Sequence, residues 1–178
     1  MIEYSALGRR ALKIIATASF LLLGGCIDSM QPLLTGAQPL IGERPRIEFY
    51  VLRDGAAHEP KAETFVWRND RYHPVRGAAS DIHDFTLHPF EGGDLIVQSQ
   101  RPGYPAEYGI ARRLADATYL LFAVDESDAD AATRDKYCGK AADAACRVAT
   151  REAVLAFARA SVAKPHSAGG LAVLLAGR

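Results

Sequence analysis

The clearest pattern in the chain is an alternation of apolar and more polar residues that starts after residue 45. Ile47, Phe49 and Val51 are each separated by one more polar residue, which is the period of two expected for a strand with one buried face. Similar short segments follow, bounded by glycine, asparagine or aspartate. The middle of the chain is therefore predicted to form strands.

The first pair of strands is predicted to be a β-hairpin spanning residues 64–75. Asn69 and Asp70 suit the two central positions of a tight turn, because both tolerate the left-handed backbone conformation that such turns need. A turn at these positions places Trp67 opposite Tyr72, an aromatic cross-strand pair that contributes up to about 1 kcal/mol.

Two further hairpins follow from the same signals. They join residues 84–88 to 95–99 around a turn at 91–94, and residues 108–113 to 118–124 around Ala115-Asp116. The run 119–124 is apolar on both faces, so it is predicted to be a central strand that is covered on both sides. Short strands joined by short turns predict an antiparallel meander, either an open curled sheet or a small barrel.

The C-terminal part of the chain is predicted to be mainly helical. Ser127 is a candidate cap for a helix that ends at about Tyr137, and Thr150 caps a clearer amphipathic helix over residues 151–163. The apolar run 171–175 is expected to return as a last strand. The predicted fold class is thus α+β: one globular domain over residues 46–178, with an antiparallel meander and one or two C-terminal helices.

The N-terminus has the three parts of an export signal. Basic residues come first, an apolar run over residues 14–23 follows, and the segment ends in Leu23-Gly24-Gly25-Cys26. About ten apolar residues are too few to span a membrane, which needs about 20. The four final residues resemble the lipobox of bacterial lipoproteins, in which an aliphatic residue and two small residues precede a cysteine.

The resemblance to bacterial lipoproteins implies a cellular location and a membrane partner for the chain. Residues 1–25 would be a signal peptide, Cys26 would carry the diacylglycerol and acyl (palmitate) chains, and the partner would be a membrane. Because Ile27 rather than aspartate follows the cysteine, the resemblance favours the outer membrane, facing the periplasm. Residues 26–45 are rich in proline and glycine and are predicted to be a tether, part of which can lie on the domain.

Composition and charge narrow the range of functions. Lys and Arg together number 21, as do Asp and Glu. Residues 1–25 hold three basic and one acidic side chain, which leaves 18 basic and 20 acidic residues and a net charge of −2 in the mature part. This balance provides no basic patch for nucleic acid. An envelope protein remains a possible partner, with Tyr104, on a proline-flanked loop, as a candidate contact.

Cys138 and Cys146 are predicted to form a disulfide. They close a nine-residue loop, and a disulfide is the expected state of such a pair in an oxidising compartment. A zinc site is the alternative, but no histidine or further cysteine lies at ligand spacing. The tight Cys-x-x-Cys spacing of redox-active pairs is absent.

The one candidate for catalysis is the region around His83, Asp84 and His88. These residue types provide metal ligands or a general base, and a periplasmic hydrolase is therefore an alternative function. Separate surface histidines are the simpler interpretation, because an odd spacing on a strand points two side chains to opposite faces. No nucleophile elbow, phosphate-binding loop or cofactor motif is present.

The leading functional hypothesis is therefore a lipid-anchored protein that binds a ligand or partner, or has a structural role, without catalysis. A carrier of small apolar ligands is a further alternative if the meander closes into a barrel.

Overall fold

A computed structural model describes residues 26–53, 56–57, 61–75, 83–140, 146–164 and 170–175. The predicted signal peptide, residues 1–25, lies outside the described residues. The strands are β1 Asp28–Ser29, β2 Arg46–Arg53, β3 Ala56–Ala57, β4 Lys61–Arg68, β5 Arg71–Pro74, β6 Phe85–Pro89, β7 Leu95–Gln100, β8 Ala106–Ala115, β9 Thr118–Ala123, β10 Gly139–Lys140, β11 Cys146–Arg147 and β12 Gly170–Leu175. The α-helices are α1 Ala131–Tyr137 and α2 Arg151–Val162, and the 3-10 turns are η1 Glu91–Gly93 and η2 Glu126–Asp128.

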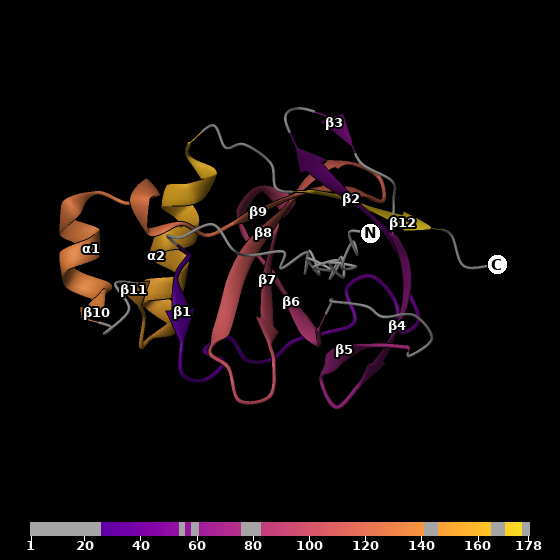
Figure 1. The fold of residues 1–178 in the computed structure, drawn as a ribbon, viewed down its shortest axis with the longest axis horizontal. Helices are drawn as coiled ribbons and strands as arrows, with labels where there is room; N and C mark the ends of the chain where they lie inside the picture. Colours follow the sequence, from indigo (N-terminus) through magenta and orange to yellow (C-terminus); the bar gives the residue numbers. More distant parts are fainter. Residues whose placement is uncertain are drawn as a thin grey trace, which may run out of the picture.

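Eight of the strands close into an antiparallel barrel in the order β2-β4-β5-β6-β7-β8-β9-β12. The ring is closed by β12, which pairs with β9 on one side and with β2 on the other (Figure 1). The predicted α+β class is confirmed, and of the two sheet forms that the sequence left open the chain adopts the barrel. Three short strands extend the sheet outside the ring, because β1 pairs with β8 and β11, and β11 with β10.

The predicted hairpins are present, with one shifted turn. Asn69 and Asp70 have φ of 50° and 58°, as a tight hairpin turn requires, and Trp67 pairs with Tyr72. The β8–β9 turn lies one residue later than predicted, because a bulge between Arg113 and Ala115 adds a residue to β8. Ala117 therefore takes the left-handed position, with φ of 62°.

The two helices differ in how well local signals predicted them. Helix α2 begins as expected, with the Thr150 side chain accepting a hydrogen bond from the Ala153 N–H. The prediction of a continuous helix capped by Ser127 is wrong. Residues 126–128 form a 3-10 turn, Ala129 is extended, and the true N-cap of α1 is Asp130, whose carboxylate accepts from the Thr133 N–H. The competing carboxylate of Asp125, which accepts from the Ser127 N–H, accounts for the interruption.

Helix α2 covers part of the outer face of the barrel and contacts β8 (Figure 1). Its apolar stripe includes Val154, Phe157 and Ala158, all of which are fully buried. They belong to one core cluster with outward-facing residues of β7, β8 and β9, namely Ile96, Tyr108, Ile110 and Phe122. Within the described residues, no helix is long and apolar enough to cross a membrane.

Residues 27–45, predicted from the sequence to be a tether that can lie partly on the domain, contact the barrel at several points. Ile27 is 0% exposed and Leu34 is 6% exposed. The Gln98 side chain accepts a hydrogen bond from the Leu34 N–H at 2.9 Å and donates one to the Leu34 carbonyl at 3.2 Å. Proline and glycine prevent regular structure here, but side chains of the barrel satisfy the backbone instead.

The same segment reaches the end of the barrel at which β2 begins. The Tyr72 hydroxyl accepts a hydrogen bond from the Ile41 N–H and donates one to the Gly42 carbonyl. Ile41 packs against the apolar cluster that includes Tyr72. Backbone bonds from Phe65 and Trp67 to residues 45 and 43 then lead the chain into β2. Residues 41–45 thus hold one end of the barrel in place.

Candidate functional site

The inward-facing side chains of the barrel form its inner wall. Residues directly opposite each other on paired strands share a face, and the outer face is the one that α2 covers, so the register identifies the inward set. The inner wall includes Ile47, Phe49, Glu63, Phe65, Trp67, Tyr72, Phe85, Leu87, Leu95, Val97, Ser99, Glu107, Gly109, Ala111, Tyr119, Leu121, Ala172 and Leu174, with Lys61 and Arg113 on the same face near strand ends. Most of these side chains are apolar.

An aromatic group makes up one side of the inner wall, over β4, β5 and β6. Phe65 makes an edge contact with Phe85 at 5.1 Å between ring centroids, and Tyr72 stacks on Phe85 at 5.0 Å. The predicted pair of Trp67 and Tyr72 is present as an edge contact at 4.8 Å. Such contacts hold the rings in fixed positions and present a rigid apolar surface.

The inner wall is less completely buried than the outer core under α2. The outer cluster includes Ile96, Ile110 and Phe157, each 0% exposed. On the inner wall, by contrast, Val97 and Leu121 keep part of their surface accessible. Both lie within β7 and β9 rather than in the loops that join the strands. Apolar side chains that keep accessible surface on an inward-facing wall favour the binding of an apolar molecule, because binding releases water from that surface.

Two carboxylates interrupt the apolar inner wall. Glu63, on β4, is 8% exposed. Glu107, on β8, is half-buried, and burial raises the pKa of its carboxyl group. The nearby Arg101 guanidinium opposes that rise and the Asp28 carboxylate adds to it. Neither residue was predicted to be functional from the sequence. The signal that could have identified them is a glutamate at a strand position where the alternating pattern places apolar residues.

The structure does not assemble the predicted histidine site. Asp84 pairs with His73 at 2.9 Å, and the other ring nitrogen of His73 lies 3.1 Å from the Arg68 carbonyl. His88 is buried on the outer face, with its Nε2 atom 2.9 Å from the Thr86 hydroxyl. Burial lowers the pKa of His88, and the Arg151 guanidinium lowers it further.

No three-residue group of potential metal ligands in the described ranges includes a histidine. His83 and His88 therefore do not form, with Asp84, the ligand set that a metal-dependent hydrolase would need.

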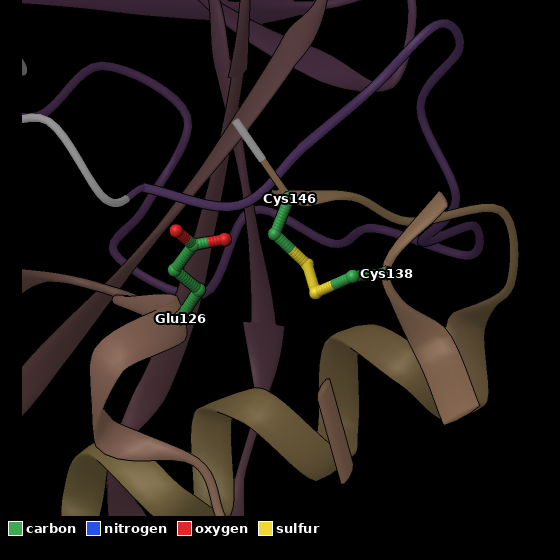
Figure 2. A group of neighbouring side chains, drawn as sticks. All are labelled: Glu126, Cys138 and Cys146. Carbon is green, nitrogen blue, oxygen red and sulfur yellow. A yellow bond between two sulfur atoms is a disulfide. The ribbon is translucent and has the colours of Figure 1, made fainter. Parts of the chain in front are cut away.

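The group that does meet is Glu126 with Cys138 and Cys146, whose ligand atoms lie within 4.8 Å of one another (Figure 2). The predicted disulfide between the two cysteines is present. Because both sulfur atoms are joined in that bond, neither is a free thiolate ligand for zinc. The disulfide connects the end of α1 to β11, which pairs with β1, so its role here is structural.

The Cys26 side chain lies where the N-terminal segment meets the barrel. Its backbone forms a bridge with Asp125. Burial raises the pKa of the Cys26 thiol to about 11, and the Asp125 and Glu107 carboxylates contribute to the rise. An unmodified thiol here would stay protonated at neutral pH, so the folded domain offers little reactive thiolate at this position.

A separate pocket lies outside the barrel, between residues 32–37 and the β4–β5 turn. Its volume is about 260 Å³, and its lining is mixed: polar side chains such as Asp70, Arg71 and Gln98 alternate with apolar ones such as Leu34 and Phe85. Tyr104 is exposed on the β7–β8 loop, as predicted, and the Arg101 guanidinium lies 5.4 Å from the centre of its ring.

No family model, curated protein or solved structure matches the chain.

Proposed function

We propose that this chain is a lipid-anchored envelope protein whose barrel binds a small apolar molecule rather than catalysing a reaction. The observation that carries the proposal is the closed barrel with an apolar inner wall that keeps accessible surface at Val97 and Leu121. Eight strands form a barrel wide enough for side chains or for one small ligand. Partial accessibility of the inner wall favours the second arrangement.

Binding is favoured over hydrolysis because the candidate catalytic groups are used elsewhere. Asp84 is paired with His73, and His88 is buried against the outer layer rather than facing the inner wall. In the described part of the chain, the polar side chains of the inner wall include Ser99, Glu63 and Glu107, together with the exposed Lys61 and Arg113, but no histidine. Histidine, the commonest general base, is therefore missing from the described part of the surface that would receive a ligand.

The anchor in this proposal is Cys26, lipidated after removal of residues 1–25. Because Ile27 is buried and residues 28–29 pair with β8, a lipid on Cys26 would hold the barrel close to the membrane without a long free linker. The Cys138–Cys146 disulfide agrees with an oxidising periplasm. Mass spectrometry of protein from its native host tests the anchor: it should begin at an acylated Cys26, and an intact leader or an unmodified thiol there would refute this part.

The ligand proposal is tested with the intrinsic fluorescence of Trp67. It is the chain's single tryptophan and lies on the inner wall. A neutral long-chain alcohol that carries bromine should quench it saturably, because bromine quenches tryptophan only at contact distance. Protein depleted of lipid by unfolding and refolding would be used, with the disulfide kept intact.

A matched pair of variants locates the bound alcohol. Val97→Phe adds volume on the inner wall and should weaken the quenching, whereas Val66→Phe on the outer face of β4 should leave it unchanged. Absence of saturable quenching in the folded wild-type protein would overturn the ligand-binding proposal. Equal quenching in both variants would show that the alcohol binds outside the barrel.

A further inference from the structure

The Glu63 carboxylate is an unpaired charge in the wall of the barrel. It lies opposite Ile47 on β2 and two residues before Phe65, so it shares the apolar inward face with both. Its residue is 8% exposed. Among the described residues it makes no hydrogen bond or ion pair. In the described part of the chain, no buried side-chain nitrogen or oxygen atom lacks a hydrogen-bond partner, so the carboxylate oxygen atoms of Glu63 keep some accessible surface.

Glu107 is a second carboxylate on the inward face of the barrel, with the Arg101 guanidinium and the Asp28 carboxylate nearby. In the order of the barrel, three strands separate β4 from β8 in either direction, so the two strands lie across from each other. Glu107 pairs in register with Ser99, and Ser99 with Phe85, on the inner wall. The raised pKa of Glu107 has burial as its main cause. Two acidic residues on different strands therefore belong to the inward face of the barrel.

No cation among the described residues pairs with Glu63. Lys61 precedes it by two residues on the same face of β4, but its side chain is exposed. Arg113, on β8, is also exposed and pairs with Asp116 at 2.6 Å. An unpaired carboxylate in an apolar surrounding is costly, and a cation brought by a ligand would remove that cost.

We propose that the ligand of the barrel is a cationic amphiphile, with a single apolar chain against the inner wall and an ammonium head group at Glu63 and Glu107. This inference rests on the proposed function, because it assumes that the barrel takes an apolar molecule. The aromatic side chains of the inner wall would contact the apolar chain of the ligand. The carboxylates account for a charge-assisted hydrogen bond from the head group.

The test compares probes that share a chain and differ in the head group. Dodecylamine, dodecanol and dodecanoate are titrated below their micelle concentrations into lipid-depleted protein at neutral pH, with Trp67 fluorescence as the readout. We expect dodecylamine to bind at least about tenfold more tightly than dodecanol, which corresponds to about 1.4 kcal/mol. We expect dodecanoate to bind more weakly than both. Butylamine, which lacks the long chain, should not bind.

Isosteric variants assign the preference to the carboxylates. Glu63→Gln should remove most of the preference for dodecylamine over dodecanol and leave dodecanol binding unchanged. Glu48→Gln is the matched control, because Glu48 lies next to Ile47 on the opposite face of β2 and is bonded to the Tyr50 hydroxyl. Glu107→Gln provides a second inward variant should Glu63→Gln fail to fold.

The outcomes separate this inference from the proposed function. If the wild-type protein binds dodecanol but shows no preference for dodecylamine, or prefers dodecanoate, the cationic head group is refuted and the apolar site stands. If no long-chain probe binds, the proposed function fails, and this inference fails with it. Binding of butylamine as tight as that of dodecylamine would replace the amphiphile with a small amine.

Discussion

Replacing Gln98 with methionine should release the N-terminal segment from the outer face of the barrel. Gln98 is 4% exposed, and its amide group both accepts from the Leu34 N–H and donates to the Leu34 carbonyl. Methionine keeps most of the volume and loses both bonds. Each backbone group left without a partner in a buried place costs about 1 to 3 kcal/mol. Two such groups give about 2 to 6 kcal/mol, and because the released segment can reach water we expect a loss at the lower end, about 2 to 4 kcal/mol.

Urea denaturation and amide hydrogen exchange measure this loss. With a slope of about 2 kcal/mol per molar urea, typical of small domains, the midpoint should fall by about 1 to 2 M. Exchange at the Leu34 amide should speed up before the barrel itself opens, because the segment can detach locally. In the proposed lipid-anchored form, a longer tether would then follow Cys26, as the proline and glycine content predicted.

A substitution two residues away serves as the control for Gln98→Met. Gln100 lies on the same face of β7, but its amide makes a 3.4 Å bond to the exposed Tyr104 carbonyl. Gln100→Met should therefore change the free energy of unfolding by less than about 0.5 kcal/mol. Unchanged protection of the Leu34 amide in Gln98→Met, or equal effects of the two substitutions, would refute the view that Gln98 holds the segment.

Three other predictions follow from local contacts. Replacing both Cys138 and Cys146 with serine should cost about 2.5 kcal/mol by the chain-entropy estimate for a nine-residue loop; urea curves that match those of the oxidised wild type would contradict it. Thr150→Ala should cost about 1 kcal/mol, because it removes the bond to the Ala153 N–H, and thermal unfolding that is unaltered would count against the cap. His88 has a lowered pKa in the folded state, so the unfolded state takes up its proton first as the pH falls below about 6.5, and stability drops in that range. His88→Gln should flatten the change in urea midpoint between about pH 7.5 and 5.5, and an unchanged slope would exclude this role.

Several structural features could be predicted from the sequence because the residues that determine each of them lie close together in the chain. Asn69 and Asp70 specify the β4–β5 turn, and that turn sets the pairing of Trp67 with Tyr72. Thr150 and the apolar stripe after it specify α2 in the same way. The disulfide was predicted from two cysteines at close spacing in a chain whose N-terminus resembles an export signal.

Other features depend on contacts between distant segments, and only the tertiary structure decided them. Alternation predicts which face of a strand is apolar, but not that β12 fits between β9 and β2 and closes the ring. The sequence pattern of residues 26–45 predicts a tether. The contacts of this segment with the barrel depend on hydrogen bonds to the distant side chains of Gln98 and Tyr72. The burial of Glu63 could not be predicted, because only closure of the barrel turns that face of β4 inward. Local patterns report the conformation of a few residues, whereas barrel closure and the partners of a buried charge depend on which strands pair across long stretches of chain.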